Sequence, residues 1–167
     1  MILNRQRAVR VARRPLEAFL KRLMGELDIR SRDLTICLVG DEEIARLNEA
    51  FRGKKGPTDV LSFPADKRRR ASKLMSKGKR AYATTKPEGA AANWLGASQA
   101  GAGYLGDIAI APETARRYAK RNGRTLKNEL RVLILHGVLH LLGYDHEADE
   151  GEMNRLERKL RRRFGLA

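Results

Sequence analysis

The segment TLKNELRVLILHGVLHLLG, residues 125–143, predicts a long helix that is apolar over most of its surface. Leu, Ile and Val recur along it at helical spacing, and few charged residues interrupt them. A helix of this composition is expected inside the core of a domain. Its second half also carries His136 and His140, so two imidazoles interrupt the most apolar stretch of the helix, residues 132–142.

The remaining segments alternate between strand and helix patterns. Strands are indicated by apolar, β-branched runs that end at Gly or Pro. Helices are indicated by apolar residues at helical intervals that follow a Pro or an acidic first turn. Asp41 is expected to cap one of these helices. The expected strands are residues 2–9, 33–40, 60–64 and 106–112, and the expected helices are residues 16–27, 41–51, 112–122, 125–143 and 149–165. This order predicts an α/β (α+β) fold, with a small mixed sheet packed with helices around a central histidine-bearing helix.

We expect one domain over residues 1–167, interrupted by a basic insert at about 65–104. The insert has no sustained periodicity and contains nine Lys and Arg residues against Asp66 and Glu88. Such a long loop inside a compact domain is functional, disordered or both. It is either a solvated segment without a role or a basic arm that holds RNA, with Trp94 as an anchor or a stacking surface.

Charge and cysteine content restrict the class of partner and the compartment. The chain has 35 Lys and Arg residues against 20 Asp and Glu, a net charge of +15. Such a field favours polyanions, of which nucleic acid is the commonest, although some proteins are basic without binding one.

The single cysteine, Cys37, excludes an internal disulfide framework and lies in an apolar run that predicts a buried thiol. No apolar segment approaches the roughly 20 residues that span a bilayer, so we expect a soluble, cytoplasmic protein without a membrane partner.

All three histidines of the chain fall between Leu135 and Glu147. His136 and His140 are four residues apart and therefore project from one helix face, and Gly143 can end the helix so that the chain turns back to His146. Three imidazoles leave the fourth tetrahedral position open, which is typical of a catalytic zinc, although imidazole also suits nickel, copper and iron. Ordinary core histidines would each need a buried partner, whereas one metal ion satisfies all three.

The spacing H-x3-H-x5-H, with Gly143 in between, matches the metzincin protease pattern at every position except one. The protease has its general-base Glu where this chain has Gly137. The ligand set is therefore metzincin-like, and the missing carboxylate is evidence against peptidase chemistry.

Three segments together resemble the YbeY family of metal-dependent bacterial endoribonucleases: HGVLHLLGYDHE, LNEAFRGKKGPTDVLSFP (47–64) and LGDIAIAPETA (105–115). The resemblance covers nearly the whole chain outside the insert, which is longer than is usual in the family. It implies a zinc ion held by His136, His140 and His146. It also implies that Arg52 corresponds to the arginine regarded as functionally essential in the family.

The same resemblance implies cleavage of single-stranded RNA in ribosomal RNA processing, at the 3′ end of small-subunit rRNA, and in ribosome quality control. The implied partners are rRNA and the small ribosomal subunit, and DNA is not expected. Arg52 suits this chemistry because guanidinium binds phosphate bidentately. Two alternatives stay open: a metalloprotease-like or other metal-dependent hydrolase, and a ribosome-associated protein that binds metal and RNA without catalysis.

Several other residues of these segments have structural explanations. Thr58 and Asp59 are expected to form the turn before a strand. Gly106 and Asp107 are expected to let their strand approach the metal-binding helix, with Asp107 bonded to backbone. Asp145 is a candidate hydrogen-bond partner for a ligand imidazole.

Overall fold

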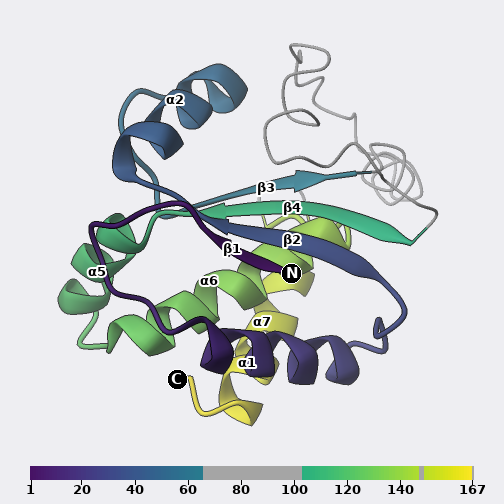
Figure 1. Cartoon of the computed structure of the whole chain (residues 1–167). Helices are drawn as coiled ribbons and strands as arrows, with labels where there is room; N and C mark the ends of the chain where they lie inside the picture. The colour runs from purple at the N-terminus through teal and green to yellow at the C-terminus, as the bar shows by residue number, and fades with distance from the viewer. Residues whose placement is uncertain (66–102, 147–148, 167) are drawn as a thin grey trace.

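A computed structural model describes residues 1–65, 103–146 and 149–166 of the chain. Within these residues it contains four strands and five helices, in the order that the sequence predicts (Figure 1). The strands are β1 (Ile2–Asn4), β2 (Asp33–Leu38), β3 (Val60–Pro64) and β4 (Tyr104–Ile110), and the helices are α1 (Arg13–Glu26), α2 (Asp41–Arg52), α5 (Pro112–Arg121), α6 (Leu126–Leu141) and α7 (Glu152–Arg163). The insert predicted at about 65–104 lies almost entirely outside the described residues, as does Trp94.

The four strands form one mixed sheet in the order β1-β2-β4-β3. β1, β2 and β4 run parallel, and β3 pairs antiparallel with β4 at the sheet edge. The parallel connections pass through α1 and α2, as parallel neighbours require a crossover. The predicted α/β class with a small mixed sheet is confirmed.

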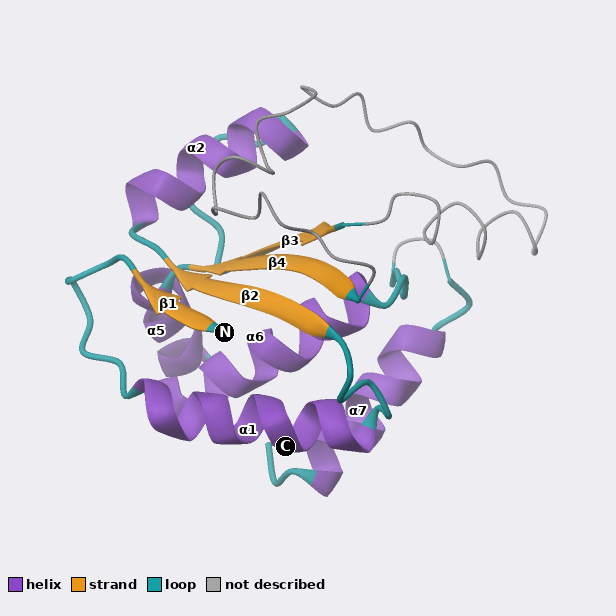
Figure 2. Ribbon diagram, turned by 45° about the vertical axis from the view of Figure 1, so that its right-hand side comes forward, coloured by secondary structure: helices purple, strands orange, loops and turns teal. Residues whose placement is uncertain are grey.

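Helix α6 lies under the sheet with α1, α5 and α7, while α2 lies above the opposite face (Figures 1 and 2). Successive strand residues point to opposite faces, so Ile36 and Ile108 face the larger core. From α6, Ile134 and Leu135 reach the same core without measurable exposure. The apolar surface of α6 is therefore buried on several sides, as its composition predicts.

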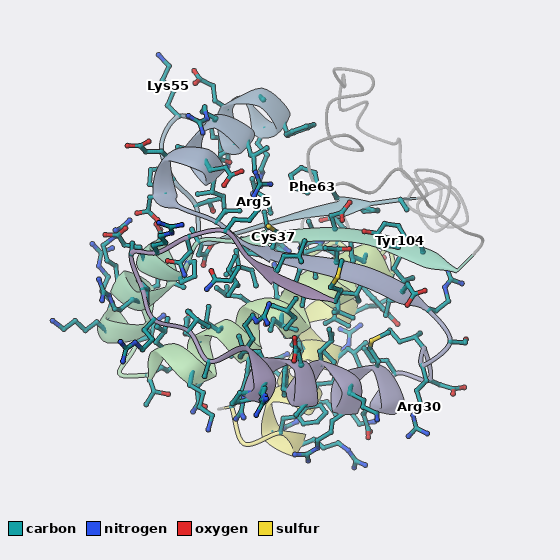
Figure 3. All side chains as sticks on the ribbon, in the orientation of Figure 1. Arg5, Arg30, Cys37, Lys55, Phe63 and Tyr104 are labelled. Atoms are coloured by element: carbon teal, nitrogen blue, oxygen red, sulfur yellow. The ribbon has the colours of Figure 1, made fainter. Side chains whose placement is uncertain are left out.

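A smaller apolar cluster lies between the other face of the sheet and α2. Cys37 of β2 belongs to it, and burial raises the pKa of its thiol to about 11. Figure 3 places Cys37 and Phe63 on this side of the sheet, with Arg5 reaching toward α2, where it pairs with Glu43 at 3.2 Å. The prediction of a buried strand thiol is confirmed.

Asp41 does not cap α2, so that prediction was wrong. Gly40 is the N-cap residue and Asp41 is the first helical residue, with no side-chain cap hydrogen bond. The Asp41 carboxylate instead accepts hydrogen bonds from the Thr114 hydroxyl at 2.9 Å and from Arg117 at 2.7 Å, both on α5. A tertiary contact between two helices has taken the place of the local cap.

The close approach predicted for Gly106 occurs with β3, not with the histidine-bearing helix α6. A Cβ on Gly106 would lie 2.2 Å from the Phe63 carbonyl oxygen, and its φ of +134° is one that L side chains rarely adopt. Asp107 was expected to bond to backbone, but it accepts a hydrogen bond from the Tyr104 hydroxyl at 2.5 Å. Burial raises the pKa of the Asp107 carboxyl, and this hydrogen bond opposes the rise.

Asp59 supports the start of β3 as expected. Its side chain accepts hydrogen bonds from the Val60 amide at 2.9 Å and from the Thr58 hydroxyl at 3.3 Å. Within the described part of the chain, no helix combines the length and the apolar character needed to cross a membrane.

Candidate metal centre

Helix α6 positions two of the three histidines. Thr125 is its N-cap, and the Thr125 hydroxyl accepts a hydrogen bond from the Asn128 amide at 3.2 Å. At the other end, Gly143 adopts a φ of +91°, and the Tyr144 amide donates to the Leu139 carbonyl at 3.1 Å. This closure is a typical glycine-dependent helix end. It reverses the chain just beyond His140 and brings the following residues back to the helix.

The reversal places His146 beside His136 and His140. Their ring centroids are 4.6 to 5.5 Å apart, and one nitrogen of each ring lies within 4.8 Å of the others. His136 and His140 are partly buried, whereas His146 is exposed, so solvent can reach the cluster. The predicted convergence of three imidazoles from two directions is therefore present.

The spacing of two of the histidine nitrogens is close to that of ligands on a tetrahedral metal ion. Zinc holds imidazole nitrogens at about 2.0–2.1 Å, which places neighbouring ligand nitrogens about 3.4 Å apart. The Nε2 atoms of His136 and His140 are 3.1 Å apart, close to that spacing. Two N–H groups facing each other at this distance would repel, so at least one of these nitrogens presents its lone pair. The donor set suits a divalent metal of intermediate softness.

The outer side of the His136 ring meets a carboxylate from the C-terminal helix. His136 Nδ1 lies 3.2 Å from Glu157 Oε2, and the other Glu157 oxygen accepts a hydrogen bond from Arg161. Burial alone would raise the pKa of Glu157, but the His136 hydrogen bond and the Arg161 guanidinium together lower it below its usual value. The lowered pKa favours the charged form of Glu157, which is in contact with the His136 ring.

Sequence reasoning singled out Asp145 as a partner for a ligand imidazole and missed Glu157. A signal was available in the sequence of α7. Glu157 stands four residues after Met153 and three before Leu160, both buried, so it lies on the inner face of a helix whose outer face is basic. A carboxylate at a core-facing position calls for a specific partner.

The packing of α6 explains why no glutamate stands between the first two histidines. Gly137 faces β4, and a Cβ at this position would lie 2.8 Å from Ile108 Cδ1 and 2.9 Å from Ile108 Cγ2. Ile108 is fully buried and cannot move aside freely. The position that carries the general base in metzincins is therefore a helix-to-sheet contact here.

We expect Gly137→Ala to lower the free energy of unfolding by about 1 kcal/mol, because overpacking against Ile108 outweighs the helix-propensity gain of alanine. Gly137→Glu is expected to lower the free energy of unfolding further, since it also places a carboxylate against an apolar side chain. Urea unfolding of the two variants measures the loss of stability in each. Gly25→Ala, also within a helix, is the matched control, because a Cβ there would meet only the end of the flexible Arg30 side chain. Equal changes in stability for Gly137→Ala and Gly25→Ala would contradict this explanation.

Arg52 lies on a different element from the histidines. It is the last residue of α2 and its side chain is exposed, followed by Gly53 in the left-handed conformation with a φ of +65°. The loop after it is held by Asn48, whose Nδ2 donates to the Gly56 carbonyl at 3.0 Å. The structure thus brings the three histidines together on α6 and the turn after it, and presents Arg52 separately at the end of α2.

Comparisons with known proteins agree on one family. The family model described as "Endoribonuclease YbeY" matches residues 1–165. Two relatives named Endoribonuclease YbeY, from Solibacter usitatus and Koribacter versatilis, are 37% and 35% identical over 96% and 99% of this chain, and the matches cover 86% of each relative. The solution structure of a Thermotoga maritima protein is similar with a TM-score of 0.53 and 26% identity, over 95% of this chain and 85% of that one.

Proposed function

The chain belongs to the YbeY endoribonuclease family, and on that premise we propose that it is a metal-dependent endoribonuclease that cleaves single-stranded RNA. The observation that carries the proposal is the convergence of His136, His140 and His146 at a place that solvent can reach. Three neutral imidazoles bind a divalent cation and leave room in its coordination sphere for a substrate oxygen.

We propose zinc as the ion, held by the three histidines. When bound, such an ion supplies electrophilic help to the nonbridging oxygens of a phosphodiester and activates water as a nucleophile. The protein contributes the orientation of the rings, because α6 fixes His136 and His140 and the Gly143 turn fixes His146. Nickel or another divalent metal with affinity for imidazole is the alternative that metal analysis of the purified protein would reveal.

Arg52 is proposed as the phosphate-binding residue. A guanidinium stays charged at any physiological pH and offers a planar pair of donors that matches two phosphate oxygens. It can therefore stabilise the additional negative charge that develops on the phosphorus oxygens during cleavage. The exposed end of α2, followed by the Gly53 turn, leaves this side chain accessible to a polymer substrate.

We expect Arg52→Ala to reduce kcat for RNA cleavage by about 100-fold, the usual loss for one donor to a developing oxyanion. Arg52→Lys is expected to recover only part of the rate, because an ammonium group does not bind phosphate bidentately. Zinc affinity should be unchanged in both variants. Arg46→Ala, an exposed arginine on the same helix, is the control and should cleave normally. If Arg52→Ala and Arg46→Ala cleaved at the same rate, Arg52 would have no special role.

A peptidase function is less well supported. Amide cleavage needs a group that delivers a proton to the leaving nitrogen, and metzincins use the glutamate that Gly137 replaces here. Cleavage of a phosphodiester depends less on such a group and more on charge stabilisation. The histidine cluster together with Gly137 therefore favours RNA over peptide substrates.

The proposal extends to ribosomal RNA, in 3′-end maturation of the small-subunit rRNA and in ribosome quality control, and hence to a cytoplasmic protein that meets the small subunit. The net charge of +15 supports a polyanionic partner of this kind, because a basic field raises both the rate and the strength of nucleic-acid binding.

The experiment compares three substrates of the purified zinc-loaded protein: a 5′-labelled single-stranded RNA, the same RNA annealed to its complement, and a denatured protein. Internal cuts in the single strand alone are the expected result. Proteolysis without RNA cleavage would overturn the proposal. Cleavage of small-subunit precursor rRNA near its mature 3′ end, compared with an unrelated RNA of equal length, tests the extension to ribosomes.

A further inference from the structure

Glu157 is a buried charge that the proposed chemistry does not use directly. Its exposed fraction is 7%, and it lies on the face of α7 that packs toward α6. A carboxylate in such a place is tolerated only when its oxygens are hydrogen-bonded and its charge is paired. The structure provides both, because one oxygen faces His136 Nδ1 at 3.2 Å and the other accepts from Arg161.

The direction of the His136 hydrogen bond follows from the chemistry of the two groups. One oxygen of Glu157 pairs with the Arg161 guanidinium, a permanent cation, so Glu157 is present as a carboxylate that can only accept, and the hydrogen lies on His136 Nδ1. A neutral ring then has its lone pair on Nε2, which is the atom that faces His140 Nε2 at 3.1 Å. The contact with Glu157 thus presents the His136 lone pair toward the other histidines.

We propose that Glu157 is a positioning residue, which holds the His136 ring as the Nδ1–H tautomer and aims Nε2 at the metal position. Arg161, one helical turn further along α7, in turn orients the Glu157 carboxylate. The inference rests on the proposed function, because it needs the three histidines to bind a metal. It adds α7 to the centre: the C-terminal helix contributes no ligand, yet it sets the orientation of one.

The test uses Glu157→Gln, which keeps the side-chain volume but removes the charge and places an amide where only acceptors stood. The expected result is a zinc affinity about 10- to 100-fold below that of the wild type, measured by competition with a chromophoric chelator. Long-range ¹⁵N–¹H NMR of the metal-free protein should show His136 as the Nδ1–H tautomer in the wild type and as a mixture in the variant.

The matched control is Glu129→Gln. Glu129 is also a buried glutamate, 4% exposed and paired with Arg124 at 3.3 Å, but it lies in the first turn of α6, at the opposite end from the histidines. If Glu157 only stabilised the fold, both variants would lower the Tm and neither would change the tautomer or the zinc affinity. That result would overturn the proposal.

The wild-type spectrum tests the inference even if Glu157→Gln fails to fold. An Nε2–H tautomer of His136 in the metal-free wild type would refute it without any variant. Failure of the proposed function has a different signature: the wild type would bind no zinc, while His136 still showed the Nδ1–H tautomer.

Discussion

Replacing His140 by alanine should reduce RNA cleavage by more than about 100-fold, which exceeds the usual loss on removing a residue that only supports a metal ligand. His140 stands at the centre of the cluster, with its ring 4.6 Å from that of His136 and 5.3 Å from that of His146. Without it, two imidazoles remain, too few for a stable three-ligand site. The rate of cleavage of a labelled single-stranded RNA and the zinc affinity measure the two effects.

The fold should survive this substitution. Alanine is the best helix former, and His140 is only partly buried on α6, so removal of the ring leaves no deep cavity. Lys127→Ala, an exposed change on the same helix, serves as the control and should leave cleavage and zinc binding intact. Wild-type cleavage by His140→Ala would show that the histidine cluster is not the reactive centre.

The largest effect on stability is expected from Gly106→Ala in β4. An added Cβ would meet the Phe63 carbonyl oxygen at 2.2 Å and the Pro64 Cα at 2.9 Å, both of them backbone atoms of β3. Neither can move without breaking the β3–β4 pairing, and the φ of +134° adds strain. We expect a loss of about 4 kcal/mol or more, and hence a fall in Tm of about 10 °C or more.

Gly53→Ala separates the two causes of that loss. Gly53 also has a positive φ, of +65°, but a Cβ there meets nothing within 4 Å. It should therefore lose only the strain of about 1–2 kcal/mol that a left-handed residue carries. Thermal unfolding of both variants gives the steric contribution as the difference between them. Equal losses would mean that the β3 backbone can adapt to a side chain at Gly106.

Periodic and local signals predicted most of the fold. The strand over residues 60–64 and the helix beginning at Pro112 were placed correctly, because proline fixes their ends. The histidine cluster was also predictable, since His136 and His140 are one helical turn apart and Gly143 marks where the chain can reverse. In each case the relevant interactions lie within a few residues of sequence.

What escaped prediction depends on contacts between distant segments. Asp41 has the sequence context of a helix cap, yet it binds α5, more than 70 residues further along the chain. Gly106 was expected to allow close approach to helix α6, although the backbone that requires a glycine there belongs to β3. Glu157 reaches His136 only because α7 packs on α6. A single sequence contains no direct record of such pairings.

The most direct test of a catalytic metal centre is to remove the metal from the purified protein and then restore it. Circular dichroism and RNA cleavage should be followed in the chelated protein and after addition of one equivalent of zinc. We expect the fold to persist, cleavage to disappear, and zinc to restore it, because the sheet and the core around α6 do not include the ligand nitrogens. Unfolding on chelation would instead assign the metal a structural role, and undiminished cleavage by the metal-free protein would contradict metal-dependent chemistry altogether.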